Sequence, residues 1–241
     1  MSNERNPLID QMQPVQVMDE SARANIETLQ SKGELGMMFA TLYEVAVEDE
    51  PELADIKVWA IGSSTPGFDF LRHTGGAAIH KDESDIGMFE VIINTDDGIG
   101  HFQRLLATRR SSAEISAQKV GIEKGKITPE QLASFIFLHE LGHIVDFMKN
   151  APSATVYSKR REQDLATLPI AGYDPSKLAQ LLESPDGKKW FFKNLRSLHN
   201  SFGVSSLNDL MVVQETAYHG METEDIPDQF AARIMKKLGL I

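Results

Sequence analysis

The chain of 241 residues contains no cysteine, which excludes disulfides, thiolate metal sites and cysteine nucleophiles. This absence fits a reducing compartment, and we expect a cytoplasmic protein. Positive charge is also scarce, because 24 Lys and Arg stand against 35 Asp and Glu, for a net charge of −11. Nucleic acid is therefore an unexpected partner, since its recognition normally needs a basic face. No apolar run approaches the roughly 20 residues of a membrane span, so no membrane partner is expected either.

The hydrophobic fraction of 41% is sufficient for one folded core. Residues 1–20 are polar and lack the basic start and apolar centre of a signal peptide. We therefore expect a flexible tail over 1–20 and a single domain over 21–241.

The most informative segment is His139-Glu140-Leu141-Gly142-His143, an HExxH motif. Residues four apart share one helix face, with Cβ atoms about 5–6 Å apart, so both imidazoles can bind one tetrahedral Zn²⁺. Glu140 would project beside the metal and take a proton from a metal-bound water as general base. The motif thus predicts two ligands and one catalytic carboxylate.

The flanking sequence predicts that this motif lies on a buried helix. Thr128 is the expected N-cap, Pro129 suits the first helical position, and Gln131 completes a capping box. Apolar positions then continue to Asn150. A chance pair of histidines is disfavoured here, because the buried Glu140 between them would carry an unexplained desolvation cost.

A third protein ligand is expected, because catalytic zinc usually has three. The metzincin spacing is disfavoured, since Asp146 and Lys149 stand where that pattern requires glycine and histidine. Near the end of the chain, Glu224 is followed four residues later by Asp228, then by an aromatic and small residues. This segment resembles the second motif of gluzincin metallopeptidases, which include thermolysin-like enzymes and small ImmA/IrrE-type proteins.

That resemblance implies that Glu224 is the third zinc ligand and that Asp228 orients a zinc-bound histidine. The spacing suits these roles, because residues i and i+4 share a helix face. Glu222 and Asp228 stay open as substitute ligands, and the acidic residues could instead be a first turn favoured by the helix dipole. Pro227 is expected in the first turn, which would place Glu224 at or just before the helix start.

Two further residues are candidates for the site. The string from His139 to Asp146 also resembles the motif helix of lethal-factor-like peptidases. Asp146 falls on the ligand face, where it could hold a ligating histidine in place or support the helix structurally. The alternative is an ordinary polar position near the helix end. Those enzymes place a tyrosine before the third ligand, which implies Tyr218 as oxyanion stabiliser, with His219 as the alternative donor. A packed aromatic and a surface histidine are the structural alternatives. The remaining histidines have no ligand-like spacing: His73, His80, His101 and His199.

The order of the expected elements predicts an α+β, zincin-like fold, in which a small mixed sheet packs on the HExxH helix and the C-terminal half is helical. The N-terminal elements are expected as helices at 22–46 and 99–120, strands at 56–61, 76–80 and 89–94, and a turn at 84–88. Gly33 and Gly36 weaken the middle of the first of these helices. Either of the last two strands could form the edge that pairs with an extended substrate.

Residues 151–223 are expected to be a helical insertion between the two motif helices. Its helices are expected at 176–183, 187–199 and 205–215. They could form one wall of the cleft, or a lid or scaffold without substrate contact.

Together these features predict an endopeptidase that binds one Zn²⁺ and acts on a protein or peptide substrate, with Glu140 as general base. Two alternatives stay open: a regulatory or binding protein on a zincin scaffold that acts on one specific partner, and a zinc hydrolase of non-peptide amides. The presence of Glu140 argues against a purely structural metal site, which needs no base.

Overall fold

The computed structural model describes residues 20–62, 64–68, 71–80 and 89–241. The expected N-terminal tail and the expected turn at 84–88 lie outside these residues, apart from Glu20. The described part has an α+β architecture, as predicted, with a small mixed sheet and many helices.

Three strands form the sheet in the described part: β1 (Lys57–Ile61), β2 (Gly76–His80) and β3 (Phe89–Asn94). Their order is β1-β3-β2, with β1 parallel and β2 antiparallel to the central β3. The sequence left open whether β2 or β3 is the edge beside the motif helix. Of these two strands, β2 lies at an edge of the sheet and packs against that helix, whereas β3 is central.

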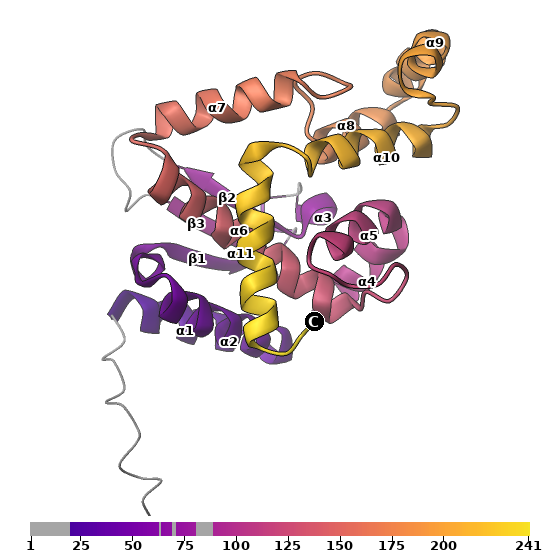
Figure 1. Cartoon of the computed structure of the whole chain (residues 1–241). Coiled ribbons are helices and arrows are strands. Elements are labelled where there is room, and N and C mark those ends of the chain that lie inside the picture. The colour runs from indigo at the N-terminus through magenta and orange to yellow at the C-terminus, as the bar shows by residue number, and fades with distance from the viewer. Residues whose placement is uncertain (1–19, 63, 69–70, 81–88) are drawn as a thin grey trace, which may run out of the picture.

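The helices of the described part are α1 (Glu20–Gln30), α2 (Gly33–Asp49), the 3-10 turn η1 (Pro51–Asp55), α3 (Leu71–Thr74), α4 (Ile99–Thr108), α5 (Arg110–Lys119), α6 (Pro129–Asn150), α7 (Ala154–Ala166), α8 (Pro175–Glu183), α9 (Pro185–Phe202), α10 (Leu207–Tyr218) and α11 (Glu222–Lys237). Figure 1 shows α1 and α2 at one end, α7–α10 at the other, and α6 between them. Among the described helices, none has both the length and the apolar character that a membrane crossing requires.

Two expectations about helix continuity are wrong. The helical pattern over 22–46 is split into α1 and α2, because Gly33 takes a φ of +75°, which glycine adopts readily. The helix expected over 99–120 is likewise split, at Arg109, whose φ of −124° and ψ of 41° are not helical. The insertion also contains α7, a helix that the sequence analysis did not predict.

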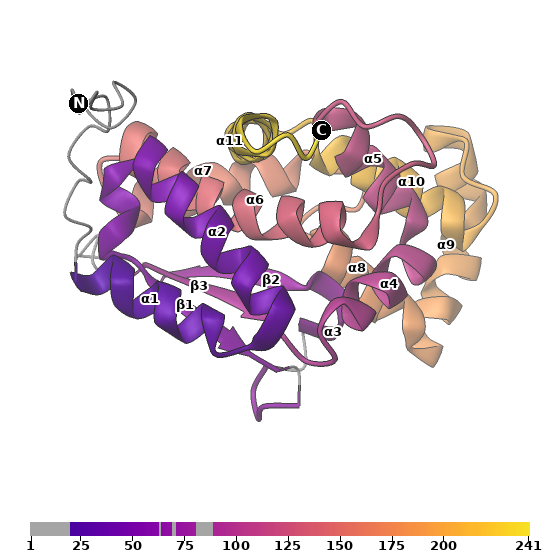
Figure 2. The same cartoon turned by 90° about the horizontal axis from the view of Figure 1, so that it is seen from below.

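The motif helix α6 has the bounds that the sequence predicted. The capping box is confirmed: Gln131 donates its backbone N–H to Thr128 Oγ1 at 3.2 Å, and Thr128 donates its own to Gln131 Oε1 at 3.0 Å. Much of the helix is buried, from Leu132 to Phe147, between the sheet side of the molecule and α11 (Figure 2). The position of the two histidines is therefore set by a helix that the rest of the core surrounds.

The C-terminal helix α11 packs along α6 and brings the second motif to the first. Gly142 allows this close approach: a Cβ atom there would lie only 2.6 Å from Pro227 Cα. The buried side chains of Leu138, Phe230 and Ile234 extend the apolar contact on either side. A small residue between the two histidines is thus a requirement of helix packing as well as part of the motif.

We predict that Gly142→Ala lowers the free energy of unfolding by about 1–3 kcal/mol, because the added methyl group forces α6 and α11 apart. Urea denaturation of the variant and the parent would measure the change. An unchanged free energy of unfolding would show that the two helices can separate without cost, and would contradict this account of their packing.

Candidate metal centre

Three buried side chains form a group that could hold a metal ion: His139, His143 and Glu224. One ligand atom from each lies within 4.8 Å of the other two. Glu224 Oε2 is 3.1 Å from His139 Nε2 and 3.6 Å from His143 Nε2. Tetrahedral coordination with bonds of 2.0–2.2 Å needs ligand atoms about 3.3 Å apart, so these separations fit a single small cation.

Local structure places each of these side chains. The two histidines lie one turn apart on α6, and their rings are 4.7 Å apart between centroids. Glu224 is the third residue of α11, within its acidic first turn. The expectation that Pro227 lies in the first turn is wrong, because α11 begins at Glu222 and Pro227 is inside the helix. Glu224 is therefore held by helical backbone rather than by the preceding loop.

Each histidine is oriented by a second partner on its other ring nitrogen. His139 Nδ1 is 3.0 Å from Asp228 Oδ1, and His143 Nδ1 is 3.1 Å from the Tyr157 hydroxyl. A ligating imidazole commonly donates this N–H to a carboxylate or another acceptor, which leaves Nε2 free for the metal. Asp228 thus lies where the sequence analysis placed it, whereas Tyr157 was not foreseen.

The Glu224 carboxylate supports the same interpretation. It is fully buried, yet among the described residues neither of its oxygens receives a well-directed hydrogen bond. The Arg161 guanidinium lies 2.9 Å from Oε1, on the side away from the histidines. A buried carboxylate costs free energy unless it is paired, so Oε2 is suited to a cation.

Electrostatics lower the pKa values of two carboxyl groups of the centre, Glu224 and Asp228. Burial alone would raise the pKa of Glu224, but the charges of Arg161 and of the two histidines lower it. Burial would lower the pKa of His139, but its contacts with the Asp228 and Glu224 carboxylates raise that pKa to about 10. A ligating imidazole is neutral, so metal binding at His139 would compete with protonation.

Asp228 is shared between two histidines. Its Oδ1 meets His139 and its Oδ2 lies 3.3 Å from His219 Nδ1. Burial would raise the pKa of Asp228, but these two contacts lower it to about 2. His219 Nε2 lies 3.4 Å from Ser116 Oγ, and the ring is buried, so His219 is not a surface histidine.

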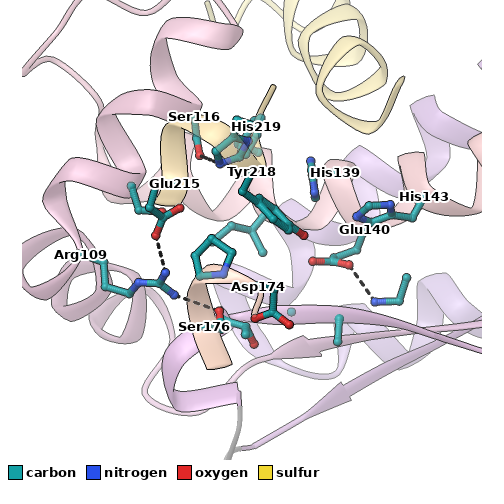
Figure 3. Close-up of a pocket in the computed structure, with 18 of the residues that line it drawn as sticks. Arg109, Ser116, His139, Glu140, His143, Asp174, Ser176, Glu215, Tyr218 and His219 are labelled. Carbon is teal, nitrogen blue, oxygen red and sulfur yellow. Dashed lines mark hydrogen bonds and ion pairs between the residues drawn. The ribbon is translucent and has the colours of Figure 1, made fainter. Parts of the chain in front are cut away.

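The centre opens on a cavity of about 430 Å³. Figure 3 shows Glu140, His143 and Tyr218 at one side of it and the ion pair of Arg109 with Glu215 at the other. Side chains from α7, α8 and α10 line this cavity together with α6 and β2. The insertion therefore forms part of the wall, which was one of the two expectations for it.

Glu140 projects into the same cavity. Its Oε2 accepts a hydrogen bond of 2.8 Å from the backbone N–H of Ala78 on the edge strand β2. Burial raises the pKa of this carboxyl group. The contact fixes Glu140 beside the histidines without making it a metal ligand.

Tyr218 also lines the cavity, and its hydroxyl accepts a hydrogen bond of 2.8 Å from Arg161 Nη2. Burial raises the pKa of Tyr218 well above its usual value, so the phenol keeps its proton. The candidate oxyanion donor therefore lies at the centre, whereas sequence reasoning missed Arg161. The sequence did contain a signal for the start of α7, the helix that carries Arg161. Ser153, which follows Pro152, is the N-cap, and its side chain accepts a hydrogen bond from the Val156 N–H.

Asp146 does not contact a ligand in the described structure. It is fully buried and pairs with Arg160 of α7 at 3.0 Å, while Asn150 donates to it at 2.9 Å. Its place is structural, since it anchors α7 to α6. Of the histidines regarded as ordinary, His101 and His199 are not among the cavity residues, and the side chains of His73 and His80 lie outside the described part.

Comparisons with protein-family models, with curated proteins and with solved structures find no match for this chain. The resemblance to gluzincins therefore stays a prediction, and function has to be argued from the site itself.

We predict that the purified parent holds about one zinc ion per chain after zinc is supplied and excess removed, and that Glu224→Gln loses most of it, because the anionic ligand is gone. Elemental mass spectrometry measures both. Glu222→Gln is the matched control, since Glu222 is exposed on the same helical turn and was the alternative ligand. If the parent and Glu224→Gln held equal amounts of zinc, Glu224 would not be the third ligand.

Proposed function

We propose that this chain is a zinc-dependent endopeptidase of the gluzincin type with a zincin-like fold. One observation carries the proposal: the Nε2 atoms of His139 and His143 converge on Glu224 Oε2 beside the cavity into which Glu140 projects. Two imidazoles and a carboxylate are the ligand set of many catalytic zinc sites, although other divalent ions also accept it. An adjacent carboxylate that is not a ligand is what hydrolysis requires and a structural site does not.

His139, His143 and Glu224 would hold the ion. Bound zinc would polarise the scissile carbonyl group and make a water molecule acidic near neutral pH. Asp228 and Tyr157 keep the two imidazoles in the orientation that presents Nε2. Their loss would weaken metal binding without removing a ligand.

Glu140 moves the protons of the reaction. Its carboxylate takes a proton from the attacking water and later gives one to the nitrogen of the leaving amine. The Ala78 N–H, bonded to Oε2, holds the group in place and leaves Oε1 for the water. Tyr218 can donate its O–H to the carbonyl oxygen as negative charge develops there.

The surroundings of the centre suit an extended peptide. The edge strand β2 runs past Glu140 and can extend its sheet by pairing with a substrate backbone. The cavity has an apolar wall that can take a substrate side chain, formed by Leu105, Ala113, Leu132, Phe135 and Ile136. Polar groups of α8 and α10 close its far end.

We predict that Glu140→Gln lowers the rate of peptide hydrolysis by about 10²–10⁴-fold while zinc stays bound, because the base is lost and the ligands are kept. The assay is a mixed peptide library incubated with zinc-loaded protein, with products identified by mass spectrometry. Chelation should stop cleavage by the parent, and added zinc should restore it.

Glu130→Gln serves as the control, since Glu130 is exposed in the first turn of the same helix. Zinc-loaded parent that cleaves no peptide in the library, or Glu140→Gln with full activity, would contradict the proposed function.

A further inference from the structure

The insertion helix α7 places one arginine against three parts of the centre. Arg161 Nη1 lies 2.9 Å from Glu224 Oε1 and 3.5 Å from His143 Nδ1, and Arg161 Nη2 donates to the Tyr218 hydroxyl at 2.8 Å. A guanidinium carries five N–H donors in a fixed planar fork, so this side chain can donate to Glu224 Oε1 and to the Tyr218 hydroxyl at once, with His143 Nδ1 as a close neighbour rather than an acceptor. These contacts join a candidate ligand to the candidate oxyanion donor.

For Glu224, the guanidinium distinguishes the two carboxylate oxygens. Oε1 is turned to Arg161, and Oε2 is turned to the Nε2 atoms of both histidines. Glu224 is fully buried, so its carboxylate is not exposed to bulk solvent and its orientation depends on protein contacts. Arg161 therefore sets which oxygen faces the metal position.

For Tyr218, the same contact sets the direction of the hydroxyl proton. Arginine has no acceptor, so the phenol oxygen can only receive a hydrogen bond from Arg161 and must direct its own O–H elsewhere. The Tyr218 hydroxyl lies within hydrogen-bonding reach of Glu224 and lines the cavity, so its O–H is left for one of these two sides. When the carboxylate binds a cation, this O–H is left for a substrate oxygen, and the charge of Arg161 makes it a better donor.

Charge also favours the contact between Arg161 and Glu224. The Glu224 carboxylate is fully buried, and the Arg161 guanidinium lies 2.9 Å from its Oε1. Without this arginine, Oε1 would lose its cationic partner inside the protein, which is costly.

We propose that Arg161 is a positioning residue that fixes the ligand oxygen of Glu224 and directs the Tyr218 O–H into the cavity. Its effect on the reaction rests on the proposed function, whereas its effect on the metal site does not. The adjacent Arg160 offers a contrast: it pairs with Asp146 on the same helix interface and does not line the cavity.

The test compares Arg161→Gln, Arg160→Gln, Tyr218→Phe and the double variant Arg161→Gln/Tyr218→Phe. Zinc affinity is measured by competition with a chromogenic chelator, and kcat and KM are measured on the best peptide from the library. We expect Arg161→Gln to bind zinc about 10–100-fold more weakly, as is typical for residues that orient ligands. Arg160→Gln should lower the unfolding temperature, but it should lose less zinc affinity and less kcat than Arg161→Gln, because Arg160 supports α7 without contacting a candidate ligand.

At saturating zinc, we expect Arg161→Gln to lower kcat more than it changes KM. In the Tyr218→Phe background the same substitution should lower kcat much less, because the hydroxyl through which it acts is gone. Arg161→Lys should recover only part of either effect, since an ammonium group cannot serve both acceptors in the same fork. It also provides a second variant if Arg161→Gln does not fold.

Parent-like zinc affinity in Arg161→Gln, or an equal loss of affinity in Arg160→Gln, would overturn the proposal. The proposal would also fail if the separate kcat losses of Arg161→Gln and Tyr218→Phe multiplied in the double variant, because the two residues would then act independently. If the parent cleaves no peptide, the proposed function fails, and the zinc affinities of Arg161→Gln and Arg160→Gln alone decide whether Arg161 positions Glu224.

Discussion

The close approach of α11 to α6 is the constraint on which the candidate metal centre depends. Two histidines one turn apart are specified by a single helix, but the carboxylate must come from a segment far along the chain. Gly142 leaves room for the backbone of Pro227, and the apolar contacts around it hold the two helices together. Glu224 and Asp228 then face His139 from successive turns of α11. The favourable packing of α11 on α6 therefore offsets the cost of burying the charged groups of the centre close together.

The insertion completes this arrangement from the opposite side. Its first helix, α7, is fixed to α6 by the buried pair of Asp146 with Arg160 and presents Tyr157 and Arg161 to the ligands. Further along, α8 and α10 line the cavity that leads to the centre. A purely protein environment leaves Glu224 Oε2 without a well-directed donor among the described residues. The positions of the three ligand atoms could hold a metal ion there.

Local signals allowed much of this to be predicted from the sequence. The capping box at Thr128 and Gln131 fixed the start of the motif helix, and i to i+4 spacing brought the two histidines, and Glu224 with Asp228, onto common faces. Interactions over long distances could not be read in this way. Asp146 points to α7 rather than to a ligand, and Arg161 reaches Glu224 only after α7 has packed. Gly33 marked a weak point in the first helical segment, and the chain breaks there at a positive φ, whereas the break at Arg109 depends on a backbone conformation that the apolar pattern does not reveal.

The most direct test of the account is X-ray diffraction from crystals of the zinc-loaded protein on both sides of the zinc absorption edge. The account predicts one anomalous peak about 2.0–2.2 Å from His139 Nε2, His143 Nε2 and Glu224 Oε2, lost below the edge. No peak at this position in zinc-saturated crystals, or a peak coordinated by other residues, would contradict it.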